Sequence, residues 1–184
     1  MELQQGNYYH IYNRSNNNEK LFYSEGNYLF FLKKYRKLTV YSDTFAYCLM
    51  PTHFHFLVKI ITPNQDPLRR AIGDMLSGYT KAINKQLGRH GNLFQKHTKA
   101  KLVTSESQFI VLVHYIHQNP YRAKLVERME DWQFSSYKDY IGKRNGNIPQ
   151  KEEVMRHFNS VEDFINQSHL MVNWISVEKA GEKM

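Results

Sequence analysis

Two runs rich in strand-forming residues, 44–50 and 53–61, are separated only by Pro51-Thr52. A connection this short cannot hold a crossover, so the two strands must pair antiparallel. The second run begins with His53 and His55 on either side of one bulky residue. Because successive side chains along a strand point to opposite faces, both imidazoles should leave the same face of the sheet.

The spacing of His53 and His55 is that of a metal clamp. Same-face neighbours on a strand lie about 7 Å apart. Two imidazoles at that spacing can converge on one ion, each with a metal–nitrogen distance of about 2.1 Å. The pair can equally be two surface polar residues on a half-buried strand. The residues alone leave both interpretations open.

The remaining segments predict further strands and helices around this hairpin. Residues 8–12, which are rich in Tyr, and residues 93–103 favour strands. Apolar residues spaced three and four apart favour three helices. These helices run over 26–41, from Asp66-Pro67 to Gly88, and from a cap at Ser105 to Asn119, which precedes Pro120. The order βαββαβ followed by a helix predicts an α+β fold. We expect a ferredoxin-like or RRM-like antiparallel sheet with helices on one face.

Length and composition favour one main domain. The chain has 184 residues, 41% of them hydrophobic, which suffices for one core. We expect a domain at residues 1–145, a linker around 143–147, and an accessory helical tail at 146–184. There is no signal-like N-terminus and no apolar run of about 20 residues, which predicts a cytoplasmic protein without a membrane partner.

The charge balance favours a polyanionic partner. The chain has 25 Lys and Arg against 17 Asp and Glu, and its 13 Tyr and 11 Phe suit base stacking on single strands, although core packing explains many of them equally well. Cys48 is the one cysteine, so neither an intrachain disulfide nor a thiolate zinc site can form. Its apolar neighbours predict a buried, inert thiol.

Tyr115 and Asn119 lie four residues apart on the last predicted helix and should share one flank. The amide oxygen of Asn119 could complete a metal shell begun by the two strand histidines, with the Tyr115 hydroxyl one turn away. The alternative makes Tyr115 a core-edge residue and Asn119 a helix terminator. Other histidines are predicted not to be ligands: His114 and His117 turn away from this flank, and His10 is isolated.

Five sequence blocks, in order, resemble those of the REP-associated tyrosine transposases, which are one-tyrosine HUH enzymes of the IS200-like type. They span roughly residues 8 to 142 and comprise Tyr9–Arg14, Cys48–His55, Gly91–Gln95, Tyr115–Val126 and Asp131–Tyr137. The chain departs from the family pattern at Thr52, where asparagine is common, and at Thr98, where an aromatic residue is common. Neither departure removes a catalytic group.

The resemblance implies a metal-dependent transposase that cleaves and rejoins single-stranded DNA beside palindromic repeat hairpins through a 5′-phosphotyrosine. In it Tyr115 is the nucleophile, and His53, His55 and Asn119 bind Mg²⁺ or Mn²⁺. We expect a monomer or homodimer. The cationic surface predicts DNA contacts from Asn13, Arg14, Arg69, Arg70, Lys96, Lys99 and Lys101. The alternative is a non-catalytic RRM-like protein that binds single-stranded nucleic acid.

Overall fold

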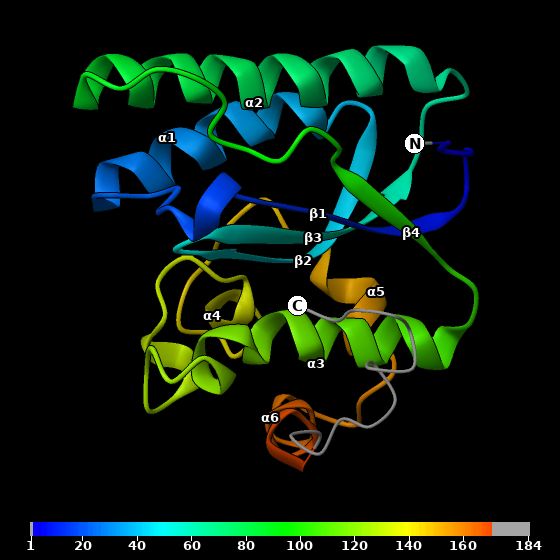
Figure 1. The fold of residues 1–184 in the computed structure, drawn as a ribbon. Helices are drawn as coiled ribbons and strands as arrows, with labels where there is room; N and C mark the ends of the chain where they lie inside the picture. The colour runs from blue at the N-terminus through cyan, green and yellow to red at the C-terminus, as the bar shows by residue number, and fades with distance from the viewer. Residues whose placement is uncertain (1, 171–184) are drawn as a thin grey trace.

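The computed structural model describes residues 2–170 (Figure 1). Its first part consists of β1 (Tyr8–Arg14), α1 (Glu25–Tyr35), β2 (Ser42–Met50), β3 (His53–Ile60), α2 (Gln65–Leu87), β4 (Lys99–Val103) and α3 (Glu106–Arg122). The short helices α4 (Tyr137–Tyr140), α5 (Lys151–Met155) and α6 (Val161–Leu170) follow. Single 3₁₀ turns lie at Asn16–Asn18, Arg36–Leu38 and Met129–Asp131.

The strands form one antiparallel sheet in the order β2-β3-β1-β4. This order and connectivity confirm the predicted α+β, ferredoxin-like class. Helices α1 and α2 cover one face of the sheet, whereas α3 crosses the other face with α4, α5 and α6 beside it (Figure 1). The sheet therefore separates two cores: Phe54 and Phe56 pack on the α1 and α2 side, and Leu57 packs on the α3 side.

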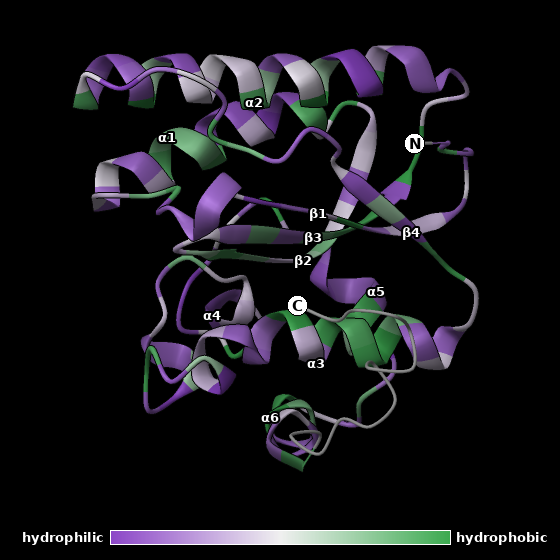
Figure 2. Ribbon diagram, viewed as in Figure 1, coloured by the Kyte–Doolittle hydropathy of each residue, from purple (hydrophilic) through white to green (hydrophobic). Residues whose placement is uncertain are grey.

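Helix α2 shows how local chemistry sets an element's bounds. The Asn64 side chain accepts a hydrogen bond from the Asp66 backbone N–H at 3.0 Å, which caps the helix. At the other end Gly88 adopts a left-handed conformation with φ of 62°, which suits a residue without Cβ. The predicted helix from Asp66-Pro67 to Gly88 is thus confirmed. Figure 2 colours much of the α2 ribbon as hydrophilic. The residues that α2 buries are Leu68, Ile72, Met75, Tyr79 and Ile83.

Three predicted boundaries are wrong. The helix expected over residues 26–41 ends at Tyr35 and is followed only by the 3₁₀ turn Arg36–Leu38. Strand β4 begins at Lys99, and the apolar residues Leu93 and Phe94 before it are buried in the core without extending the strand. Helix α3 continues through Pro120 to Arg122, although proline was expected to stop it. A proline near the end of a helix affects only the hydrogen bond and the carbonyl of the preceding turn, and the last turn still closes because Ala123 N–H donates to the Asn119 carbonyl.

The segment predicted as a linker, residues 143–147, is anchored to the domain. The Arg144 guanidinium donates to the Asp139 carboxylate at 2.8 and 2.7 Å and to the Gln133 carbonyl at 2.7 Å. Further along, Phe164 of α6 is fully buried in the core on the α3 side. Residues 146–170 thus pack on the same structure as residues 1–145, and the division into domain and tail stays a prediction.

We expect Arg144→Ala to lower the free energy of unfolding by about 3 kcal/mol, because it leaves the buried Asp139 carboxylate without its counter-charge. Urea unfolding followed by circular dichroism measures the change. The matched control is Arg128→Ala, which breaks the exposed ion pair to Asp131 and should unfold near the native urea concentration. Equal losses in both variants would contradict a structural role for the Arg144 contact.

Candidate active site

His53 and His55 lie on the sheet face that α3 covers. Register places His53 opposite Arg14 and His55 opposite Tyr12 of β1. The two imidazole centroids are 5.0 Å apart with the rings nearly perpendicular, at 83°. His55 is buried and His53 is half-buried at the end of the strand. The alternation of side chains along β3 therefore places both imidazoles on the same face, as expected.

Helix α3 brings Tyr115 to the same place. Its ring centroid lies 5.7 Å from that of His55, at 77°, and its side chain is buried. The position follows from the apolar stripe of α3, which packs Phe109, Leu112 and Ile116 into the core below the sheet. The phenol and the paired imidazoles thus share one side of the sheet.

Asn119 follows Tyr115 by one helical turn and is also buried. Its Nδ2 donates to the backbone carbonyl of Tyr115 at 2.8 Å. This bond fixes the amide against its own helix and uses the nitrogen, so that the carbonyl oxygen Oδ1 is the atom suited to bind a cation. The role of Asn119 as a metal ligand stays a prediction.

The Nδ1 atoms of both strand histidines are engaged. Thr52 Oγ1 lies 3.1 Å from His53 Nδ1, and His10 Nε2 lies 2.9 Å from His55 Nδ1. Burial, and then the neighbouring imidazoles of His10 and His53, lower the pKa of His55 well below its usual value, so the ring is neutral at pH 7. Its buried Nε2 has no hydrogen-bond partner. A neutral imidazole with a bare nitrogen is what metal binding requires.

Two imidazoles of β3, and the Asn119 amide one turn beyond Tyr115, are donor types that can bind a divalent ion. Among residues 2–170, no cluster of three or more His, Cys, Asp or Glu could hold a metal. The site would therefore have a neutral ligand set, which leaves the charge of an ion to act on a bound anion. A metal site formed by His53, His55 and Asn119 stays a prediction.

His10 was expected to be isolated, and this prediction was wrong. It is 1% exposed, and its ring contacts His55 and lies 6.3 Å from the Tyr115 ring centroid. The pairing of β1 with β3 places it diagonally to His55, and the sequence does not reveal that register. The sequence does show that His10 and Tyr12 are two residues apart on one strand, which places both side chains on the same face of β1.

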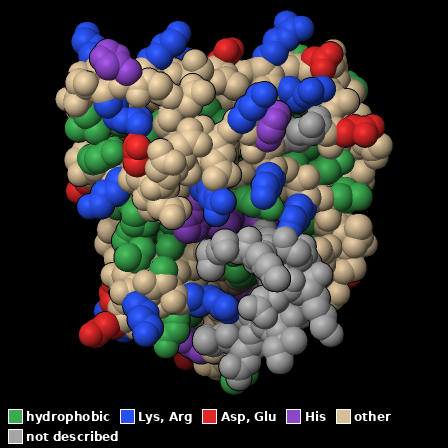
Figure 3. Space-filling model, in the orientation of Figure 1, with side chains coloured by type: hydrophobic (Ala, Val, Ile, Leu, Met, Phe, Trp, Pro, Cys, Tyr) green, Lys and Arg blue, Asp and Glu red, His purple; other side chains and the backbone are tan. Residues whose placement is uncertain are grey.

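The predicted cations divide between two faces of the molecule. Lys99 and Lys101 of β4 stand opposite Tyr12 and His10 of β1, so all four share the α3 face. Their ammonium groups lie 5.7 and 5.9 Å from the Tyr12 ring centroid. Exposed Arg14 extends this group along β1. In the edge-on view of Figure 3, Lys and Arg side chains gather beside a group of histidines. Sequence reasoning had not included Tyr12.

The other predicted DNA contacts lie elsewhere. Arg69 and Arg70 are exposed on α2, which covers the opposite face of the sheet, and Arg69 pairs with Asp66 at 3.9 Å. Lys96 is exposed in the loop before β4. Asn13 is buried, and its Nδ2 donates to the Gln95 carbonyl and to Thr98 Oγ1. Asn13 thus holds the loop before β4.

His114 and His117 line the flank of α3 away from the sheet histidines, as predicted. His114 Nδ1 lies 2.8 Å from Ser168 Oγ, and His117 Nε2 lies 2.7 Å from Ser136 Oγ. Burial lowers the pKa of His114 to about 4, so it is neutral at pH 7.

Cys48 is also buried as predicted. No helix within residues 2–170 has the length and apolarity to cross a membrane.

Comparison with known proteins supports one family. No family model matches the chain. A curated relative from Haemophilus influenzae, named as a REP-associated tyrosine transposase, is 25% identical over 104 residues, which is 52% of this chain and 58% of that relative. The chain therefore spans less than two thirds of that relative's length.

A solved structure, described as a REP-associated tyrosine transposase bound to a REP hairpin, has a TM-score of 0.64 and 17% identity. The match covers 84% of this chain and 90% of that one. At this identity the likeness shows a shared fold. Together with the curated relative it confirms the resemblance seen in the sequence blocks.

Proposed function

From its resemblance to the REP-associated tyrosine transposases in sequence and fold, we propose that this protein cleaves and rejoins single-stranded DNA beside palindromic repeat hairpins. One observation carries the proposal: the ring of Tyr115 lies 5.7 Å from that of His55, on the face that also presents His53. A phenol beside two imidazoles suits attack on a phosphodiester better than passive binding does.

In the proposed reaction Tyr115 Oη attacks the scissile phosphorus and loses its proton. The new O–P bond replaces the bond from phosphorus to the 3′ oxygen, which takes up a proton and leaves as a 3′-OH. The 5′ end of the DNA stays on the protein as a phosphotyrosine. Because one phosphodiester is exchanged for another, a different 3′-OH can reverse the step and join strands without ATP.

The Tyr115 phenol must be activated, because a tyrosine with an ordinary pKa of about 10 is protonated at neutral pH. His53, His55 and the Asn119 oxygen would hold Mg²⁺ or Mn²⁺, and the bound ion would stabilise charge that develops on the phosphate. The residues themselves hold the reacting groups in place. Asn119 is tied to the Tyr115 carbonyl, so the amide and the phenol are held on one helical turn.

The single strand would follow the cations on the α3 face. Lys99 and Lys101 can pair with phosphates beside the half-buried ring of Tyr12, which itself stacks on His10. Arg14 extends the same path along β1. Asn13 would act indirectly by holding the loop that carries Lys96, and Arg69 and Arg70 would contact only DNA that passes over α2.

The test is to incubate the protein with hairpin oligonucleotides labelled at either end, in Mn²⁺, and to separate products on denaturing gels. We expect a covalent adduct that keeps the label downstream of the cut and that EDTA prevents. An adduct carrying the upstream label would contradict the proposed polarity. Tight hairpin binding with no cleavage under any metal would favour the binding-only alternative.

A further inference from the structure

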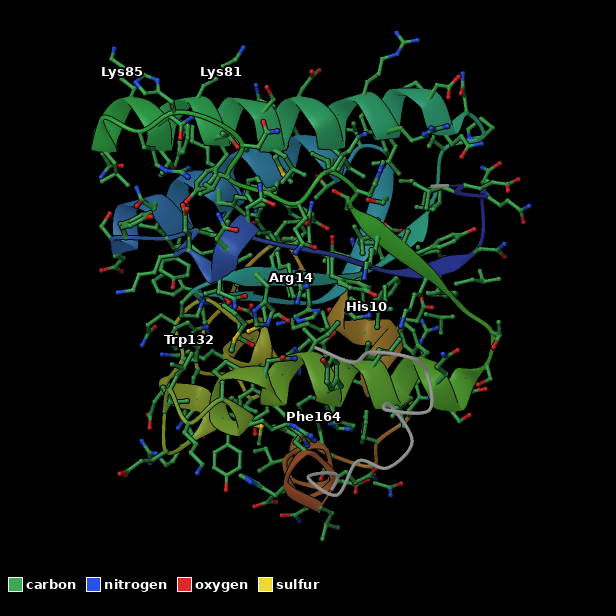
Figure 4. The ribbon with its side chains drawn as sticks, in the orientation of Figure 1. His10, Arg14, Lys81, Lys85, Trp132 and Phe164 are labelled. Atoms are coloured by element: carbon green, nitrogen blue, oxygen red, sulfur yellow. The ribbon has the colours of Figure 1, made fainter. Side chains whose placement is uncertain are left out.

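His10 projects from β1 towards α3 (Figure 4). Its Nε2 lies 2.9 Å from His55 Nδ1. The planes of the two rings differ by 24°, and their centroids are 5.0 Å apart. Each ring nitrogen lies about 1.1 Å from its ring centre. The 2.9 Å contact therefore runs almost along the line that joins the centres, within both ring planes. This is the geometry of an N–H···N hydrogen bond.

The same geometry excludes an ion shared between these two nitrogen atoms. Nitrogens on opposite sides of a metal ion along one line would lie about 4.2 Å apart, since each bond is about 2.1 Å. The observed separation of His10 Nε2 from His55 Nδ1 is 2.9 Å. The contact is therefore between the imidazoles themselves.

The surroundings of His55 decide which ring donates. If His10 donated, the proton of His55 would sit on its Nε2, which is buried and has no hydrogen-bond partner. A buried N–H without an acceptor is costly. If His55 donates from Nδ1, Nε2 instead presents a lone pair. The second arrangement satisfies the donor and leaves the nitrogen ready to bind an ion.

We propose that His10 is a positioning residue: it accepts the Nδ1 proton of His55 and thereby fixes the tautomer and rotation of that ring, with Nε2 presented to the metal ion. The inference rests on the proposed function for the role of the ion. In many metal sites a carboxylate or carbonyl holds a histidine ligand in this way. Here an imidazole does so, and it adds no negative charge beside the ion.

The first measurement needs no metal. In ¹⁵N-labelled, metal-free protein, NMR of the imidazole nitrogens should show His55 protonated on Nδ1. In His10→Phe, which keeps a ring but removes the acceptor, the proton should move at least partly to Nε2. His10→Gln offers an amide oxygen as a replacement acceptor and should retain the Nδ1 proton. A native His55 protonated on Nε2 would overturn the inference.

The second measurement is Mn²⁺ affinity, followed by electron paramagnetic resonance without DNA. We expect His10→Phe to bind Mn²⁺ about 10–100-fold more weakly than native protein, and His10→Gln to recover most of the loss. The control, His90→Phe, alters an exposed histidine after α2 and should bind as native. Circular dichroism checks that each variant is folded.

The outcomes separate the two proposals. If native protein and His10→Phe bind Mn²⁺ equally, the role of His10 fails while the metal site stands. If the native protein binds no Mn²⁺, both the metal site and the role of His10 fail. Weaker binding by His10→Phe, rescue by His10→Gln and the matching change of tautomer would together support a positioning role.

Discussion

Tyr115→Phe is expected to reduce DNA cleavage by about 10⁴-fold or more and to abolish the covalent adduct, while hairpin binding stays at the native level. The substitution removes only the nucleophilic oxygen. The ring, which packs 5.7 Å from His55 and 6.3 Å from His10, keeps its shape and its contacts. Cleavage on denaturing gels and binding by fluorescence anisotropy measure the two quantities on one oligonucleotide.

Tyr121→Phe is the matched control, because Tyr121 lies on the same helix and is 40% exposed. It should form the adduct at the native rate. An adduct that persists in Tyr115→Phe and disappears in Tyr121→Phe would place the nucleophile at the end of α3 and refute the proposed site. Unchanged cleavage in both variants would show that neither phenol is the nucleophile.

His53→Ala is expected to reduce cleavage by about 10³-fold, because loss of a ligand removes Lewis-acid stabilisation worth several kcal/mol. His53 is the better test of the pair, since it is half-buried and its removal disturbs the core less than loss of buried His55. The rate is measured on a labelled hairpin across a Mn²⁺ titration. Higher Mn²⁺ should restore part of the activity.

Native protein treated with EDTA is the metal-removal control for His53→Ala. Its activity should disappear and then return fully when Mn²⁺ is added back. Thermal unfolding by circular dichroism shows whether the variant is folded as native. Cleavage that continues in EDTA, or a His53→Ala variant with native activity at low Mn²⁺, would contradict a metal role for this histidine.

The features predicted well from sequence are those that depend on local periodicity. The Pro51-Thr52 connection fixed the pairing of β2 with β3, and alternation along β3 fixed the shared face of His53 and His55. Helical spacing likewise placed Tyr115 and Asn119 on one flank of α3. Each inference needed only neighbours within a few residues in the chain.

The features predicted poorly depend on contacts between distant segments. His10 joins His55 only through the register of β1 against β3, which no local pattern specifies. Asn13 was predicted to contact DNA from the surface, yet the loop before β4 folds over it. The apolar residues Leu93 and Phe94 favoured a strand by composition, and tertiary packing used them as core instead.

Helix α3 is held on both sides, by the sheet and by α6, and every residue from Leu112 to Pro120 is buried. A nucleophile on such a helix has no freedom to swing. On the proposed chemistry, a captured DNA end would stay where it was cut, and the strand to be joined must diffuse to it. The length of unpaired DNA between hairpin and break would then set the local concentration of that strand, and so the choice between resealing and exchange.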